Sequence, residues 1–196
     1  MLTEISVLCL ISYLVGSIPF GVILAKVQHV DIRKQGSGNI GATNVARVLG
    51  KKSGLLPLLG DVVKGLLVVL GASQFYDKPL LIALAGLMVF LGHLFSIFLK
   101  FQGGKGVATS LGLFSYIMPW ATLCAGGVFA SCLWISGYVS IGSIMAAISL
   151  PLFAIYFKLP LPYIYLAVIV GLFTLQRHHD NILRLIEGTE AKFLKK

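Results

Sequence analysis

The stretch Gln35–Asn44 combines glycines with small hydroxyl and amide residues, a composition suited to binding a phosphate group. Gly36, Gly38 and Gly41 let the backbone curl so that successive N–H groups point inward, and such a nest of amides binds anions. Basic residues on both sides would add positive charge, and these are Arg33, Lys34, Arg47, Lys51 and Lys52. The sequence therefore predicts a phosphate site, whereas the alternative is a flexible loop.

Two nucleotide-binding motifs share the glycine spacing of this stretch, but each lacks a required part. Gly36-x-Gly38-x-x-Gly41 matches the dinucleotide fingerprint, which must follow a strand and open a βαβ unit, whereas an apolar block precedes it here. A P-loop needs Lys-Ser/Thr where this chain has Ala42-Thr43. We therefore exclude nucleotide hydrolysis.

A short helix is expected after the glycines, ending near Leu49. Thr43 or Asn44 would cap it, and the N–H groups of a capped helix terminus can bind an anion. Arg47 then lies one turn past the cap. The amides of Ser37, Gly38 and Asn39 would complete the anion site.

A second glycine-rich loop surrounds a lysine and consists of Gly103, Gly104, Lys105 and Gly106. A third polar cluster, Arg177–Glu190, is expected to be helical. At about 100° per residue, Arg177, Asn181 and Arg184 would share an arc of about 60°, with His178 on its flank. A basic amphipathic tail on lipid headgroups is the alternative, and it explains the arginines but not His178 with Asn181.

Composition places the chain among membrane proteins. Of its 196 residues, 57% are apolar and 12% charged, and its mean hydropathy is +0.92. A spanning helix needs about 20 apolar residues. The candidate spans are Ile5–Ala25, Gly54–Ser73, Leu80–Leu99, Val107–Met118, Trp120–Gly137, Val139–Phe157 and Leu161–Gln176. We expect an all-α integral membrane protein with one domain over residues 1–196.

Charge predicts the topology of these spans. The net charge of +9 is concentrated after the first, third and last spans, so the positive-inside rule places the N-terminus outside and the C-terminus in the cytoplasm. Seven spans satisfy this, with the fourth short or re-entrant. Because the basic residues lie at span ends rather than on a soluble surface, nucleic-acid binding is excluded.

Polar residues inside the spans require separate explanations. Asp61 and Lys64 lie about 10 Å into the second span, where a pair three residues apart offsets part of the cost of burying charge. We expect a structural pair near the site, with a direct role as the alternative. His93 is either a hydrogen-bonded packing residue or catalytic. Gly16–Gly21, with Pro19, should break the first helix, either as a packing kink or as a crevice for an acyl chain.

These motifs together resemble the acyl-phosphate-dependent glycerol-3-phosphate acyltransferases, the PlsY family of bacterial membrane enzymes. The resemblance covers the whole chain through GSIPFG, GSGNIGATNVARVLGKKSG, DVVKG, GGKGVATS and RHHDNILRLIEGTE. It implies a multi-pass protein of the bacterial cytoplasmic membrane with its active site on the cytoplasmic face. It also implies acyl transfer from acyl phosphate to the 1-hydroxyl of glycerol 3-phosphate, which gives lysophosphatidic acid and phosphate, the first acylation of phospholipid synthesis.

The resemblance implies roles for matching residues and partners. Ser37 and Arg47 match functional positions, with Asn39, Thr43 and Asn44 beside them. Gly103, Gly104, Lys105 and Gly106 match the segment associated with glycerol 3-phosphate, and His178, Asn181, Arg184 and Glu190 match the third motif. The implied partners are both substrates, membrane lipid and the enzyme that supplies acyl phosphate.

Direct attack by the acceptor hydroxyl is the mechanism we expect, without a metal or other cofactor. An acyl phosphate is already activated, so the enzyme must mainly position groups and stabilise charge, with Arg47 and Lys105 in that role. The base is either His178 or the donor's own phosphate. The alternatives are a Ser37 acyl-enzyme and, from another class, a membrane transporter of a phosphorylated solute.

Overall fold

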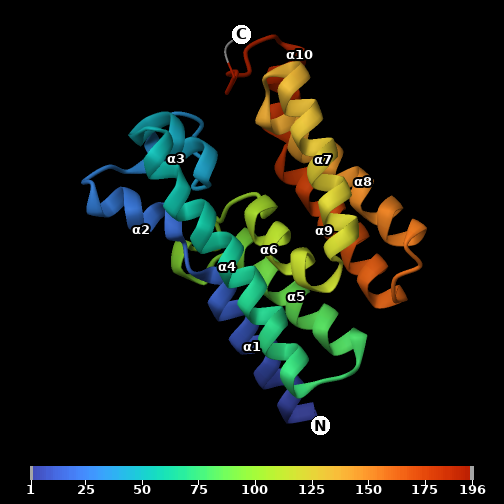
Figure 1. Ribbon diagram of the computed structural model, residues 1–196. Coiled ribbons are helices and arrows are strands. Elements are labelled where there is room, and N and C mark those ends of the chain that lie inside the picture. The colour runs from blue at the N-terminus through green and yellow to red at the C-terminus, as the bar shows by residue number, and fades with distance from the viewer. Residues whose placement is uncertain (1, 195–196) are drawn as a thin grey trace. The chain divides into compact units, whose positions relative to one another are not determined.

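The computed structural model describes residues 2–194, and these form ten α-helices and two short 3-10 helices joined by loops (Figure 1). The bounds are α1 Leu2–Ser17, α2 Phe20–Val27, η1 Ile32–Lys34, α3 Ala42–Leu49, α4 Lys51–Phe75, α5 Pro79–Leu94, η2 Ile97–Leu99, α6 Val107–Ile117, α7 Pro119–Ser136, α8 Val139–Tyr156, α9 Leu161–Arg177 and α10 His179–Ile186. The predicted helical class is confirmed. The chain divides into two compact units, Met1–Tyr116 and Ile117–Lys196.

Five helical segments are long and apolar enough to cross a membrane. They are Leu2–Val27, Lys51–Phe75, Pro79–Leu99, Pro119–Ser136 and Val139–Tyr156. Two further apolar helices are shorter: α6 has 11 residues and α9 has 17. Each apolar block expected from the sequence is therefore helical, and the fourth is short as expected. The count of seven spans and the orientation of the termini stay predictions.

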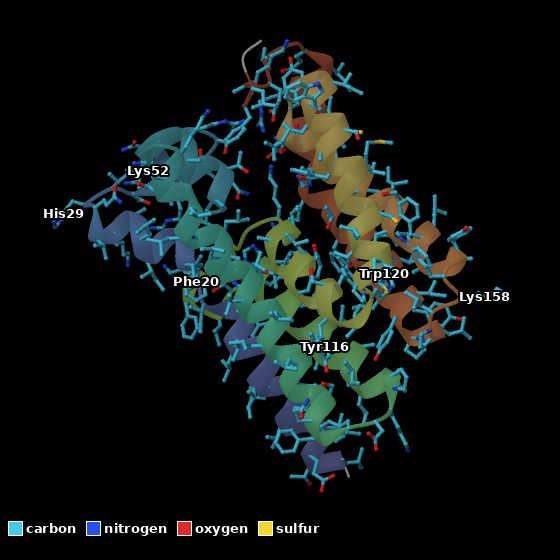
Figure 2. All side chains as sticks on the ribbon, viewed as in Figure 1. Phe20, His29, Lys52, Tyr116, Trp120 and Lys158 are labelled. Atoms are coloured by element: carbon cyan, nitrogen blue, oxygen red, sulfur yellow. The ribbon has the colours of Figure 1, made fainter. Side chains whose placement is uncertain are left out.

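Between Leu55 and Leu67, the exposed side chains of α4 are apolar and the charged side chains are buried. Leu55, Leu56 and Leu67 are more than half exposed, whereas Asp61 and Lys64 are buried. A water-soluble helix has the opposite pattern, with charged side chains exposed. The pattern of α4 is the one expected of a helix in contact with lipid, because charged side chains within a membrane turn toward the protein interior. Figure 2 shows the side chains that cover the helices of each unit.

In the first unit, α5 packs against both α1 and α4 (Figure 1). Small residues allow the close approach of α1 and α5. A Cβ at Gly16 would overlap the backbone of Val89, and a Cβ at Gly92 would overlap the carbonyl of Tyr13. Close backbone contact of this kind is how helices associate in membranes, where the hydrophobic effect does not drive them together.

The predicted break in the first helix is confirmed, since α1 ends at Ser17 and α2 begins at Phe20, one residue after Pro19. Two carbonyls at the break are bonded by other helices. The Ser96 hydroxyl donates to the Ser17 carbonyl at 2.5 Å, and the Lys64 ammonium donates to the Ile18 carbonyl at 2.9 Å. These contacts support the packing-kink interpretation.

Side chains at the break are also engaged in packing. Tyr13 donates its hydroxyl to the Phe95 carbonyl, and the ring of Phe20 lies against Gly60 of α4. Tyr13 and Phe20 lie on either side of the break at which an acyl crevice was the alternative to a packing kink. Their observed contacts join α1 and α2 to the neighbouring helices.

In the second unit, α8 packs against both α7 and α9, and α10 follows α9 after His178 (Figure 1). The segment after α10 returns to the turn between α7 and α8. There the amides of Phe193 and Leu194 donate to the Gly137 carbonyl at 2.8 and 3.3 Å. This return brings Glu190 to the start of α8.

Candidate active site

The first glycine-rich stretch is organised around the side chain of Asn44, which is 2% exposed. Its amide nitrogen donates to the carbonyls of Ile32, Gln35 and Asn39, at 3.3, 3.0 and 2.8 Å. Its amide oxygen accepts from the Ser37 N–H at 2.8 Å. One buried side chain therefore satisfies four backbone groups, so Asn44 shapes this loop from inside it.

Two glycines of the stretch adopt positive φ. Gly36 has φ of 60° and Gly38 has φ of 70°, a region that side chains with a Cβ rarely occupy. A Cβ at Gly36 would in addition overlap the Asn44 amide oxygen. Glycine at 36 is therefore required both by the backbone conformation and by Asn44, which explains why the two residues occur together.

Two expectations about this loop are wrong. The N-cap of α3 is Gly41, without a side-chain bond, so neither Thr43 nor Asn44 caps the helix. The amides of Ser37 and Gly38 donate within the loop, to the Asn44 side chain and to the Gln35 carbonyl. They therefore do not form the inward-facing nest, because their bonds close the turn instead.

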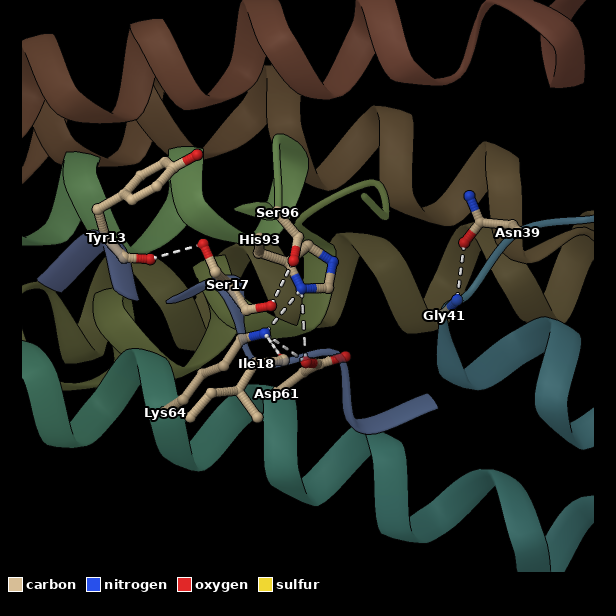
Figure 3. A network of polar contacts seen from close by, with 9 residues as sticks. All are labelled: Tyr13, Ser17, Ile18, Asn39, Gly41, Asp61, Lys64, His93 and Ser96. Atoms are coloured by element: carbon tan, nitrogen blue, oxygen red, sulfur yellow. Dashed lines mark hydrogen bonds and ion pairs between the residues drawn. The ribbon is translucent and has the colours of Figure 1, made fainter. Parts of the chain in front are cut away.

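Groups that could meet a ligand remain on the loop and on α3. Ser37 is exposed, and Arg47 lies half-buried on α3. The side chain of Asn39 turns back to accept from the Gly41 N–H at 2.8 Å (Figure 3). The Ser37 hydroxyl and the Arg47 guanidinium are thus the side-chain groups of this motif best suited to a polar substrate.

The second glycine-rich loop is tied to the end of α5. The Gly103 N–H donates to the Leu94 carbonyl at 3.0 Å, and the Gly104 N–H donates to the His93 carbonyl at 3.1 Å. Gly106, with φ of 84°, then turns the chain into α6. Lys105 lies half-buried between these anchored residues. Its backbone is therefore fixed on both sides.

Asp61 and Lys64 form the structural pair expected from the sequence, and His93 joins it. The Lys64 ammonium lies 2.7 Å from the Asp61 carboxylate and 2.9 Å from His93 Nδ1 (Figure 3). His93 Nδ1 is 3.4 Å from the same carboxylate oxygen. All three side chains are buried, so a charged pair and an imidazole bind one another away from solvent.

The third cluster, in the second unit, fixes the ring of His178. Its Nδ1 lies 2.8 Å from the Thr174 carbonyl, and His178 is 3% exposed. Because a carbonyl can only accept, Nδ1 carries the proton and Nε2 is the basic nitrogen of the neutral ring. In the neutral ring, Nε2 is therefore the nitrogen that can accept a proton.

Glu190 holds the rest of this cluster. Its carboxylate accepts from the Asn181 amide at 2.6 Å, from Arg184 Nε at 2.7 Å and from the Ser140 hydroxyl at 3.1 Å. Burial alone would raise the pKa of Glu190, but the hydrogen bonds from Arg184 and Asn181 outweigh it, so the pKa lies below its ordinary value. Glu190 is therefore an ionised carboxylate that orients both partners.

The predicted arc of Arg177, Asn181 and Arg184 is only partly correct. α9 ends at Arg177 and α10 begins at His179, so one continuous helix does not carry all three. Asn181 and Arg184 do share a side of α10 and both reach Glu190. The sequence interpretation assumed that helical periodicity continues through residue 178, where the chain instead turns.

Several functional contacts were not found from the sequence. Thr174 stands four residues before His178, and that helical spacing could have identified its carbonyl as a partner. Ser140 is 50 residues from Glu190 in sequence and carries no such signal. Within residues 2–194, no group of three or more His, Cys, Asp or Glu side chains is placed to hold a metal ion.

Comparison with known proteins identifies the family. The family model described as glycerol-3-phosphate acyltransferase matches residues 6–188. The glycerol-3-phosphate acyltransferase of Trichlorobacter lovleyi is 49% identical over 183 residues, 93% of this chain and 94% of that protein. That of Geobacter sulfurreducens is 45% identical over 193 residues, 98% and 99% of the two chains.

Two crystal structures of PlsY, an integral membrane glycerol 3-phosphate acyltransferase, share this fold. Its glycerol 3-phosphate form superposes with a TM-score of 0.93 at 39% identity, covering 97% of this chain and 96% of that one. Its lysophosphatidic acid form gives 0.90, also at 39% identity, with coverage of 96% and 95%. The present chain is an acyltransferase and belongs to the glycerol-3-phosphate acyltransferase family.

Proposed function

We propose that this protein transfers a fatty acyl group from acyl phosphate to the 1-hydroxyl of glycerol 3-phosphate, releasing lysophosphatidic acid and phosphate. The observation that carries the proposal is the fixed tautomer of His178, whose Nδ1–H donates to the Thr174 carbonyl. A buried imidazole with Nε2 as its basic nitrogen can take a proton from an attacking hydroxyl. The names of the relatives and of the solved structures support glycerol 3-phosphate as acceptor.

The proposed reaction needs no covalent intermediate on the enzyme. The acceptor hydroxyl attacks the carbonyl carbon of the mixed anhydride as its proton passes to His178 Nε2. The tetrahedral centre then collapses, the bond from carbon to the phosphate oxygen breaks, and phosphate leaves with its electron pair. The proton on Nε2 passes to the departing phosphate or to solvent, which restores the base.

Basic side chains have binding and charge-stabilising roles in this scheme. Arg47 and Lys105, each half-buried, bind the phosphate groups of the substrates, because partial burial strengthens attraction between opposite charges. Arg184 presents its guanidinium while Glu190 holds its Nε. Asn181, oriented by Glu190, positions the substrate, and Ser37 contributes its exposed hydroxyl.

We further propose the arrangement in the membrane that the charges favour. The protein crosses the bacterial cytoplasmic membrane seven times and acts as a single domain over residues 1–196. The N-terminus lies outside, and the three basic segments that carry the polar motifs face the cytoplasm. The distribution of lysine and arginine supports this orientation.

The test is turnover by the purified full-length protein in lipid nanodiscs with palmitoyl phosphate and glycerol 3-phosphate. We expect phosphate release that requires both substrates and a 1-acyl product identified by mass spectrometry. Palmitoyl-CoA in place of palmitoyl phosphate is the control, and preferential use of the thioester would overturn the proposed donor. Glycerol 3-phosphate counterflow in vesicles without an acylated product would instead select a transporter.

A further inference from the structure

His93, near the C-terminal end of α5, lies between a buried ion pair and the loop that carries Lys105. Its Nδ1 faces Asp61 and Lys64 of α4 (Figure 3). Its opposite edge faces Gly104. The side chain is 5% exposed. Its backbone is also used, since the His93 carbonyl accepts the Gly104 N–H. The proposed reaction does not use this residue.

The partners of Lys64 determine which nitrogen of His93 carries the proton. An ammonium group has three N–H donors, and three acceptors surround it: the Asp61 carboxylate at 2.7 Å, the Ile18 carbonyl at 2.9 Å and His93 Nδ1 at 2.9 Å. With Lys64 charged, Nδ1 accepts and the ring proton is on Nε2. That edge of the ring faces Gly104, and the network is neutral overall.

The ring, rather than the local backbone conformation, requires glycine at position 104. The positive-φ glycines of the described chain include Gly106 but not Gly104. A Cβ built on Gly104 would overlap His93 Nε2, and the three nearest atoms all belong to that ring. At Gly103 the obstruction is different, because a Cβ there would meet the backbone carbonyls of His93 and Leu94.

We propose that His93 is a positioning residue for Lys105: its ring, held in place by Asp61 and Lys64, seats Gly104 and so fixes the direction in which Lys105 leaves the loop. The inference rests on the proposed function, in which Lys105 binds a substrate phosphate. A lysine side chain is long and flexible and loses conformational entropy when it binds a phosphate. The direction of its Cα–Cβ bond decides how far the side chain must be ordered to reach that phosphate. Burying the charges of Asp61 and Lys64 costs desolvation energy, and a role in positioning Lys105 explains why the chain retains them.

The test is a double-mutant cycle between His93 and Gly104, read as KM for glycerol 3-phosphate. His93→Asn is the primary variant, because its amide oxygen can replace Nδ1 as the acceptor for Lys64 while the edge facing Gly104 is removed. In the unmodified background we expect Gly104→Ala to raise KM about tenfold, equivalent to about 1.4 kcal/mol. In the His93→Asn background the same substitution should change KM less than about threefold.

Gly103→Ala is the matched control. It lies one residue away in the same loop, but its Cβ meets backbone carbonyls, so removing the His93 ring cannot relieve the overlap. We expect Gly103→Ala to raise KM by the same factor in both backgrounds. If Gly104→Ala raised KM for glycerol 3-phosphate by the same factor in the two backgrounds, the inference would be overturned.

A second readout separates positioning from support of the fold. His93→Asn should raise KM for glycerol 3-phosphate several-fold while kcat and KM for palmitoyl phosphate stay within about twofold. His93→Gln keeps a polar atom near Nε2 and should recover most of the KM. If His93 served only the fold, the variants would lose active protein and thermal stability with KM unchanged, and that result would contradict the proposal.

Failure of the positioning role and failure of the proposed function give different results. Turnover by the unmodified protein without coupling between His93 and Gly104 would overturn the positioning role alone. Absence of turnover in the unmodified protein would overturn the proposed function and the positioning role together. If His93→Asn does not fold, the cycle is repeated with His93→Ser, which removes the same ring edge and is judged by the same criterion.

Discussion

The Asn181 amide donates a 2.6 Å hydrogen bond to the Glu190 carboxylate, which lies nine residues further along the chain. The same carboxylate accepts from Arg184 and from Ser140 at the start of α8. One buried acid therefore fixes two candidate substrate-binding side chains and, within the second unit, holds the segment after α10 against α8. This double role makes Glu190 a sensitive position for mutation.

Glu190 should make the protein acid-sensitive in a definite pH range. Its pKa in the folded protein lies below the ordinary value of 4.5, so the unfolded chain binds the proton more tightly. The contribution of ionised Glu190 to the free energy of unfolding is complete above the pKa that Glu190 has in the unfolded chain. It is lost as the pH falls through the lower pKa of the folded protein. Thermal unfolding of the second unit's helices, followed by circular dichroism from pH 7 to pH 3, should show this loss.

Glu190→Gln supplies the matched variant for that measurement. The amide has nearly the same shape, but it cannot ionise and weakens the bonds from Asn181 and Arg184. We expect lower stability at pH 7 and a smaller decrease below pH 5 than in the unmodified protein. An equally steep decrease in both proteins would show that another group causes the acid sensitivity.

His178→Gln tests whether this histidine is the base. The amide cannot take a proton, so kcat should fall by about 10²–10⁴-fold if Nε2 accepts the hydroxyl proton. Circular dichroism and the melting temperature control for folding, and His178→Asn, whose amide nitrogen takes the place of Nδ1 on the Thr174 carbonyl, should lose the same activity. A variant that keeps most of its rate would instead identify the phosphate of the donor as the base.

The sequence alone predicted the helices and the polar motifs well because each leaves a local signal. An apolar block of sufficient length predicts a span, Pro19 predicts a helix break, and Asp61 with Lys64 three residues later predicts an ion pair. The structure confirms the helices, the break and the ion pair. Each of these inferences required only neighbours along the chain.

Contacts between distant residues could not be predicted in the same way. His93 binds Lys64, which is 29 residues away in the sequence, and Ser140 binds the Glu190 carboxylate, which is 50 residues away. No periodicity links these partners. Competition between bonding partners also misled the sequence interpretation. Asn44 is a good helix cap by type, but its side chain instead satisfies the loop backbone, and Gly41 is the cap.

Asn44→Asp should show how much the bonds donated by the Asn44 side chain contribute to stability, apart from the bond that it accepts. Aspartate keeps an oxygen to accept from the Ser37 N–H but loses the donor to three carbonyls, whose oxygens would then face a buried carboxylate. We expect a loss of about 1–3 kcal/mol in the free energy of unfolding, or more with the added charge. Denaturation of the detergent-solubilised protein measures it, and unchanged stability would contradict the structural role of Asn44.

Gly16 and Gly126 form a matched pair for testing close packing in the membrane. Both lie inside apolar helices, but a Cβ at Gly16 would overlap the backbone of Val89, whereas a Cβ at Gly126 has nothing within 4 Å. Gly16→Ala should therefore lower the melting temperature by forcing α1 away from α5. Gly126→Ala should leave it unchanged or raise it, since alanine favours a helix by about 1 kcal/mol over glycine. Equal effects of the two substitutions would mean that α1 and α5 do not depend on backbone contact at Gly16.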